Sequence, residues 1–314
     1  MTSGSINFTE NRNEIIIDAF SKIRVFAIGE TPTTDDVNLA SRALNRMVKE
    51  WQAKGWHLWK KREATLFLAK GVHEYLLGGT SSDHVTEEYV KTTLTADAAS
   101  GTDTLTVTSS AGMTAADYIG IVLDDSSLFW TTIKAVLGAT SVQTDAVLTG
   151  KASKNKYVFA YTTKITRPLL IPNARRYTVI TGQEIPLISY SHSQYYDMPT
   201  KESQGSPNIF NYDPQLDSGK LNIWPTPADI NYLINFTYAK SIEDFDNITD
   251  NPDFPQEWLD ALVYNLALNL GPDYGKANNP DFSLIVQRAK ESLDVLQGFD
   301  SERGSIFFQP DNRP

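Results

Sequence analysis

The residue types that most often carry out chemistry are sparse in this 314-residue chain and are not spaced for catalysis. It has no cysteine and four histidines, none of which lies four positions from another. Disulfides, thiolate metal sites and a His-Glu-x-x-His zinc motif are therefore excluded. The nucleophile elbow Gly-x-Ser-x-Gly is absent, and Gly150-Lys151 is followed by Ala152, where a phosphate-binding loop needs Ser or Thr. The sequence predicts no catalytic residue, no metal site and no cofactor.

Acidic residues are plentiful, and one run of them, from Glu243 to Asp253, resembles a calcium-binding loop at first sight. Its third ligand position is Ile248, and it lacks the turn glycine and the terminal glutamate of such loops. We expect this run to be a solvated connection that leads into a helix. A pair of carboxylates acting as general acid and base, as in a cell-wall hydrolase, is an alternative that the sequence leaves open.

A run of seven basic residues without an acidic one lies in the middle of the chain. The chain as a whole is acidic, with a net charge of −10, so we do not expect nucleic acid to bind over its whole surface. The basic run suits a solvated face whose lysines protect an edge strand. It equally suits a patch that faces DNA or a neighbouring subunit. The residues expected in such a patch are Lys151, Lys154, Lys156, Lys164 and Arg167.

Three tryptophans, Trp51, Trp56 and Trp59, lie close together in the sequence. Packing at a junction between a helix and a sheet explains them. The alternative is a subunit interface, because tryptophan is enriched where proteins associate.

The elements that must position these residues follow from two changes in composition. Residues 8 to about 60 and about 254 to 298 have helical periodicity, whereas residues about 62 to 242 are β-rich. This predicts an α+β fold, in which a helical bundle built from both chain ends encloses a large antiparallel β insertion, a barrel or a sandwich. The expected parts are a helical domain (1–60 and 253–299), a β-rich domain (61–252) with a possible separate module (91–162), and an extended tail (300–314).

Four amphipathic helices are predicted. The first runs from about Thr9 to Phe26, and the second has Thr34 as its N-cap and ends at Gly55. The third begins near Pro255, and the fourth has Asn279 as its N-cap. The apolar stripe of the third helix consists of Trp258, Leu262, Leu266 and Leu270.

Within the β-rich part, residues 118–123 and 128–133 flank the turn Asp124-Asp125-Ser126-Ser127, which predicts a hairpin. Residues 192–218 are rich in Gly, Pro, Asn and aromatic side chains, and we expect a long loop with aromatic anchors. Residues 300–314 lack helical periodicity but contain Ile306-Phe307-Phe308.

Several segments together resemble head-to-tail adaptor proteins of short-tailed bacteriophages. They are Met47-Val48-Lys49-Glu50-Trp51-Gln52-Ala53-Lys54-Gly55, Leu221-Asn222-Ile223-Trp224-Pro225-Thr226-Pro227, Tyr232 to Tyr238, and Pro255-Gln256-Glu257-Trp258-Leu259-Asp260-Ala261-Leu262 through Asp273-Tyr274-Gly275. The similarity covers both helical ends and residues 165–298. It is an overall pattern, without a short diagnostic signature.

The resemblance implies a virion protein of the neck and tail region, made in the host bacterial cytoplasm. Members of this family form a ring, typically of twelve subunits, under the portal protein, and double-stranded DNA passes through it without sequence-specific binding. Their C-terminal extensions dock on the portal, and their β part receives the tail nozzle or tail fibres. By this resemblance the portal-docking residues are Ile306, Phe307, Phe308, Gln309 and Arg313. An interface at Trp51, Trp56 and Trp59 would then be a contact of the ring.

The alternative to an adaptor is a tail or fibre-attachment protein that binds a receptor, with the aromatic 192–212 segment contacting a glycan. No stretch approaches 18 uninterrupted apolar residues, so we expect no membrane partner. The first residues lack the basic start and long apolar run of a signal peptide.

Overall fold

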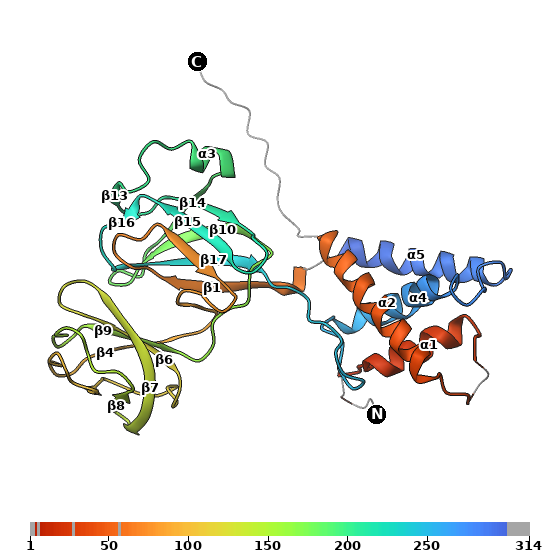
Figure 1. Ribbon diagram of the computed structural model, residues 1–314, viewed down its shortest axis with the longest axis horizontal. Helices are drawn as coiled ribbons and strands as arrows, with labels where there is room; N and C mark the ends of the chain where they lie inside the picture. The colour runs from red at the N-terminus through yellow and green to blue at the C-terminus, as the bar shows by residue number, and fades with distance from the viewer. Residues whose placement is uncertain (1–3, 5–6, 27–28, 56–57, 300–314) are drawn as a thin grey trace, which may run out of the picture. The chain divides into compact units, whose positions relative to one another are not determined.

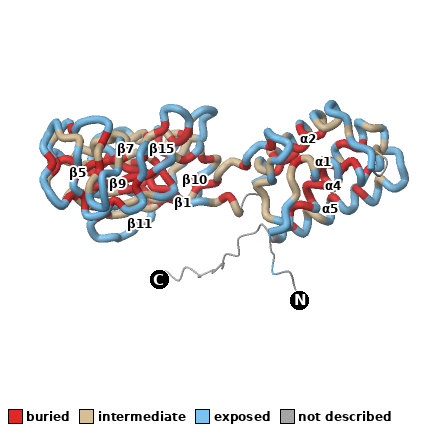
Figure 2. Tube along the Cα trace, turned by 90° about the horizontal axis from the view of Figure 1, so that it is seen from below, coloured by how far each residue is buried: buried red, intermediate tan, exposed pale blue. Residues whose placement is uncertain are grey.

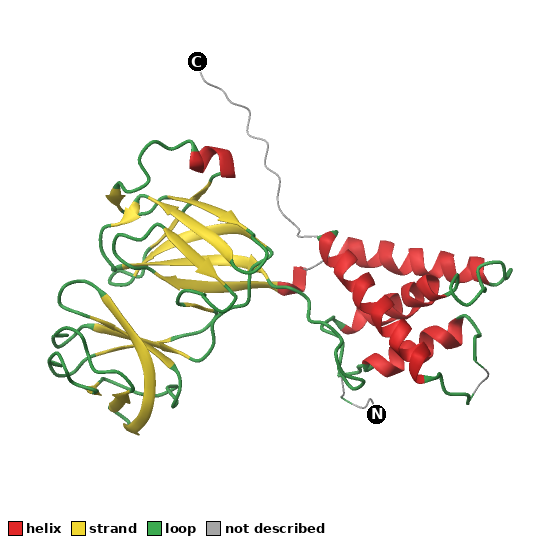
Figure 3. Cartoon of the chain, viewed as in Figure 1, coloured by secondary structure: helices red, strands yellow, loops and turns green. Residues whose placement is uncertain are grey.

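The computed structural model describes residues 4, 7–26, 29–55 and 58–299, and the chain forms two compact units. The helical unit joins Met1–Lys60 to Ile242–Pro314, and the β unit is Lys61–Ser241. Figure 1 shows helices from both ends of the chain in one unit, and Figure 3 shows that the insertion is built of strands. The predicted α+β fold, with a helical bundle made by both chain ends and a large antiparallel β insertion, is confirmed.

The helical unit contains α1 (Arg12–Lys22), α2 (Thr34–Ala53), the 3-10 turns η1 (Leu58–Lys60) and η2 (Gln256–Trp258), α4 (Leu259–Leu270) and α5 (Phe282–Phe299). Two predicted helix starts are wrong by one to three residues. The first helix, expected from about Thr9, has Asn11 as its N-cap, and the N-cap of α2 is Thr33 and not Thr34. Each cap closes a reciprocal capping box with the acid three positions on. Asn279 accepts a hydrogen bond from the amide of Asp281 in a turn, so α5 begins only at Phe282.

One apolar core holds the four long helices together, and Figure 2 shows buried positions running through the unit. The stripe predicted for the third helix is buried: Trp258, Leu262, Leu266 and Leu270 are all in this core. The sequence places the second part of the helical domain from residue 253. The chain rejoins the helical unit already at Ile242, because Ile242 and Phe245 are buried in the same core. In the described part of the chain, no helix is long and apolar enough to cross a membrane.

Two sheets of the β unit form a sandwich. The five-stranded sheet has the order β11-β10-β17-β1-β3, and the four-stranded sheet has the order β12-β14-β15-β2. Leu66 and Phe236 from the first sheet share a core with Phe210, Leu221 and Tyr75 from the second. The bounds are β1 (Lys61–Phe67), β2 (Glu74–Leu77), β3 (Val85–Thr86), β10 (Leu170–Thr178), β11 (Glu184–Pro186), β12 (Ile188–Ser189), β14 (Ile209–Asp213), β15 (Gly219–Trp224) and β17 (Tyr232–Ala239).

Residues 90–161 form a separate six-stranded sheet in the order β4-β9-β6-β7-β8-β5. Its two edge strands meet at a bridge between Leu94 and Val107, so the sheet curls around its own core and leaves no long unpaired edge. The predicted hairpin is confirmed, with Val122 opposite Leu128. The strands are β4 (Val90–Thr93), β5 (Thr104–Thr106), β6 (Tyr118–Val122), β7 (Leu128–Gly138), β8 (Ser141–Thr144) and β9 (Tyr157–Tyr161).

The prediction of a loop over residues 192–218 is wrong for three stretches of that segment, which form regular elements. It contains α3 (His192–Tyr196), β13 (Gln204–Gly205) and β14, and β13 pairs with β16 (Thr226–Pro227). Ser191 and Gln194 form a capping box that starts α3, and β14 pairs along its length with β15. The pairing partners lie outside the segment, so its own composition gives no sign of them.

Close packing in the curled sheet requires glycine at position 120. A Cβ atom on Gly120 would lie 2.7 Å from the ring of Trp130, its partner on β7. We expect Gly120→Ala to lower the free energy of unfolding by about 1–3 kcal/mol through overpacking, measured by urea denaturation. Gly138→Ala, at the end of β7 in the same sheet, is the matched control, because no heavy atom lies within 4 Å of its added Cβ. Equal stability of the two variants would contradict this account.

Candidate functional site

Of the three tryptophans considered for a ring interface, the structure describes Trp51 and Trp59. Trp51 is 3% exposed and lies in the core of the helical unit, in agreement with the packing explanation. A ring contact made by these tryptophans stays a prediction. Trp59 is half-buried, and its ring centroid is 4.7 Å from that of Trp258. Its indole nitrogen donates to the carbonyl oxygen of Asp253 at 3.1 Å. Trp56 lies outside the described residues.

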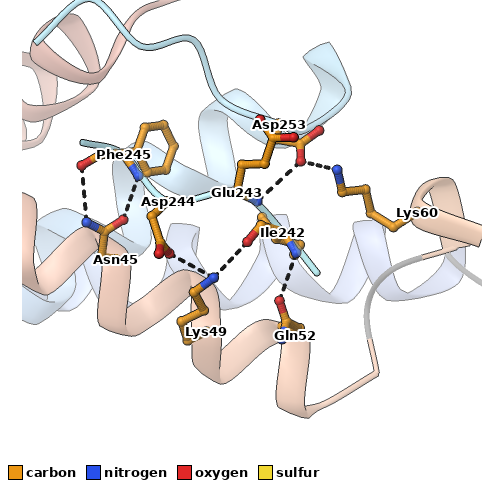
Figure 4. A network of polar contacts seen from close by, with 9 residues as sticks. All are labelled: Asn45, Lys49, Gln52, Lys60, Ile242, Glu243, Asp244, Phe245 and Asp253. Carbon is orange, nitrogen blue, oxygen red and sulfur yellow. Dashed lines mark hydrogen bonds and ion pairs between the residues drawn. The ribbon is translucent and has the colours of Figure 1, made fainter. Parts of the chain in front are cut away.

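The acidic run that follows the β unit is a strap over α2, defined here as Ile242–Asp253. Three side chains of α2 at helical spacing bind its main chain, as Figure 4 shows. Gln52 accepts from the amide of Ile242 at 2.9 Å, and Lys49 donates to the carbonyl oxygen of Ile242 at 2.7 Å. Asn45 bonds both main-chain groups of Phe245, at 2.9 and 3.2 Å. The polar face of α2 therefore has a structural role that its sequence alone does not reveal.

Carboxylates of the strap form ion pairs and hydrogen bonds within the helical unit. Asp244 pairs with Lys49 at 2.7 Å, and Asp253 pairs with Lys60, whose side chain is only 6% exposed. Asp250 accepts from the amides of Asn247 and Asp246, and these bonds hold the pKa of its carboxyl below the ordinary value. The connection expected from the sequence is largely exposed, and it is also bonded to the helical unit through these contacts. Among the described residues, no group of three or more His, Asp or Glu side chains is placed to hold a metal ion.

The basic run 151–176 meets acids brought from elsewhere in the β unit. Lys151 pairs with Asp97 at 3.1 Å, and Lys156 lies 3.8 Å from Asp124. The main-chain amide of Lys154 also donates to Asp97. The hydrogen bond to Asp97 raises the pKa of Lys151, which therefore stays charged. Much of the charge that looked uncompensated in the sequence is thus locally balanced.

The last two residues of the predicted patch, Lys164 and Arg167, contact other parts of the β unit than those lysines do. Lys164 donates to the carbonyl oxygen of Ser82 and lies over the ring of Tyr118, and burial lowers its pKa. The main chain of Arg167 passes so close to Gly78 that a Cβ there would lie 2.2 Å from its amide nitrogen. A DNA-facing role of these five residues stays a prediction.

An aromatic cluster joins the sandwich to the curled sheet, and the sequence reasoning missed it. Phe67 of β1 lies among Trp130, Phe159 and Tyr161 of the curled sheet, with ring centroids 5.1 to 5.9 Å apart. Alternating aromatic residues at 157, 159 and 161 were the available signal. These contacts fix the docking of the two modules within the β unit.

His84 is the polar centre of this aromatic junction. Its ring stacks on Trp130 with centroids 3.8 Å apart and planes 5° from parallel, and its Nδ1 lies 2.6 Å from the hydroxyl of Tyr161. Burial, assisted by the charge of Lys164, lowers the pKa of His84 to about 3. The imidazole is therefore neutral at pH 7 and shares a hydrogen bond with the Tyr161 hydroxyl.

The aromatic segment considered for glycan binding uses its rings mainly for packing. Tyr195 is buried, and the ammonium of Lys201 lies 5.8 Å from its ring centroid and 5.4 Å from that of Tyr196. Tyr196 is 42% exposed, and His192 lies against it with centroids 4.3 Å apart. Receptor binding by this segment stays a prediction. The portal-docking residues Ile306, Phe307, Phe308, Gln309 and Arg313 lie outside the described residues.

No protein-family model matches this chain, and no curated protein does. Among solved structures it is similar, over a short part, to the Gp54 tailspike of Acinetobacter baumannii bacteriophage AP22, which is in complex with A. baumannii capsular saccharide. The sequence identity is 14% and the TM-score is 0.22. The match spans 26% of this chain and 16% of the tailspike chain, and a likeness of this size carries no argument.

The contribution of the Lys60–Asp253 ion pair to stability can be compared with that of a more exposed pair. We expect Lys60→Met to lower the free energy of unfolding by about 2 kcal/mol, because Asp253 loses its partly buried cationic partner and retains only the amide of Glu243. Lys54→Met is the control, since Lys54 pairs with Glu50 at 2.7 Å on the exposed face of α2. Its loss is expected to cost less than about 1 kcal/mol. Chemical denaturation measures both, and a larger effect at Lys54 would refute the structural role of Lys60.

The aromatic junction is expected to respond to pH. The pKa of His84 is lowered in the folded state, so the unfolded chain binds the extra proton first. The stability from its neutral form is present above about pH 6.5, the unfolded value, and is lost as pH falls toward about 3. His84→Phe keeps an aromatic ring without the titration. Thermal unfolding at pH 7 and pH 5 is expected to show a smaller pH-dependent loss for the variant than for the unchanged protein.

Proposed function

We propose that this chain is a virion structural subunit that forms a ring between the portal and the tail of a short-tailed bacteriophage. The ring extends the DNA channel and supports the tail nozzle or fibres. One observation carries the proposal: both ends of the chain close a single helical core, and the whole β unit, Lys61–Ser241, is inserted between them. This is the layout that the resemblance to head-to-tail adaptors implies.

The segments that carry the resemblance are structural elements of both units. Residues 47–55 include the last turns of α2, and residues 255–275 include η2 and α4, which pack on α2 in the helical core. Residues 221–227 include most of β15, and residues 232–238 lie in β17. The similarity therefore concerns the residues that set the architecture, which supports a shared scaffold.

A ring requires two different surfaces of one subunit that bind each other, and the helical unit has a surface suited to such contact. Phe8 is exposed beside the carboxylates of Glu10, Asp18 and Asp260, which share this hollow with Lys22. Ile17 of α1 is exposed as well. Burial and then repulsion from Asp18 raise the pKa of Glu10. A cationic surface of a neighbouring subunit would relieve this repulsion while covering the apolar side chains.

Assembly on portal rings tests the proposal. Mixed with purified portal rings from the phage that encodes it, the chain is expected to add as one closed ring, typically of twelve copies. Native mass spectrometry and electron microscopy measure the copy number. Deletion of residues 300–314 is expected to leave the fold intact, shown by its circular dichroism, and to abolish this docking.

Two results would count against the proposal in different ways. Normal portal docking by the truncated chain would remove the docking role of residues 300–314 alone. Absence of any ring on the portal, together with specific binding on a glycan array, would replace the adaptor by a receptor-binding tail protein.

A further inference from the structure

The helical unit has an open groove beside the first turn of α5, and the interactions described above do not use it. Its volume is about 610 Å³, and residues from the end of α1, from α4 and from the segment leading into α5 line it. Ile23 and Ile285 are buried at this place, whereas Leu284 is 61% exposed. An apolar side chain left in solvent beside a groove marks a surface that gains free energy when it is covered.

The same groove is locally cationic in a chain whose net charge is −10. Four basic residues line it against two acids, Asp281 and Glu291. Arg24 pairs with Asp281 at 3.0 Å and Arg288 with Glu291 at 3.6 Å. Two cations remain: Lys22, which lies over the ring of Tyr264, and Lys276, whose ammonium has no ion-pair or hydrogen-bond partner among the described residues. The groove thus suits a segment that combines large apolar side chains with a carboxylate.

The sequence after α5 contains such a segment within reach. From Leu284 to Phe299 the helix rises about 22 Å, at about 1.5 Å per residue. Ile306 follows Phe299 by seven residues, which span about 23–25 Å when extended. Chain running back along α5 therefore brings Ile306-Phe307-Phe308 level with Leu284. Asp311 follows three residues later and supplies the carboxylate.

We propose that residues 306–311 of the same chain occupy this groove, with Phe307 against Leu284 and Asp311 among the cations. The contact covers the apolar triplet in the free subunit. Any partner that binds the same triplet must then compete with the groove. The proposal concerns the free chain and stands independently of the portal ring proposed above.

Disulfide trapping in the full-length chain tests this contact, because the protein has no cysteine of its own. One variant pairs Leu284→Cys with Phe307→Cys, and the control pairs Val295→Cys with Phe307→Cys. Val295 is 72% exposed and lies on the same face of α5, closer to residue 307 in sequence. Oxidation of dilute protein with glutathione disulfide is followed by mass spectrometry, which separates disulfides within one chain from those between two chains.

Comparing the rates at which the two cysteine pairs form disulfides distinguishes docking in the groove from random collision of the chain. In a chain without docking, the shorter loop to Val295 closes about threefold more readily. We expect the reverse, with the Leu284 pair forming within one chain at least tenfold faster. Adding Lys276→Glu is expected to slow the Leu284 pair several-fold and to leave the Val295 pair unchanged. Faster trapping at Val295, or a Leu284 disulfide that forms only between two chains, would overturn the proposal.

Discussion

The architecture depends on one constraint: the chain must leave the helical unit and return to it at neighbouring points. The antiparallel pairing of β1 with β17 meets this constraint, because Lys61, the first residue of the β unit, lies opposite Ala239 near its end. On the helical side, the ion pair of Lys60 with Asp253 and the bonds from α2 to the strap hold the two connections. A β insertion of this length is compatible with a single helical core only because both ends are tied in this way.

The strap also explains why so many acidic residues gather in one stretch without forming a ligand site. Asp244 and Asp253 bind lysines of the helical unit, and Asp250 caps the turn that precedes it. An ammonium partner already neutralises the carboxylate, which weakens its attraction for a further cation. The same reasoning applies in the β unit, where Asp97 and Asp124 neutralise lysines of the basic run.

The two modules of the β unit are joined by aromatic packing around Phe67 and His84, a contact with directional as well as apolar character. Stacked rings and the hydroxyl bond to Nδ1 restrict the orientation of one module on the other. Gly120 leaves the space in which the ring of Trp130 takes part in this contact.

The sequence by itself determined the α+β class, the helical stripes, the hairpin around residues 124–127 and the inserted position of the β part. These follow from local periodicity and turn chemistry, which neighbouring residues decide. Tertiary structure alone decided the rest, because the deciding partners are distant in sequence: Asp253 for Lys60, Asp97 for Lys151, β15 for β14, and Trp130 for His84. Trp51 is the clearest example. The sequence allowed either a core or an interface position for it, and only its packing in the helical core, against Trp258, placed it in the core.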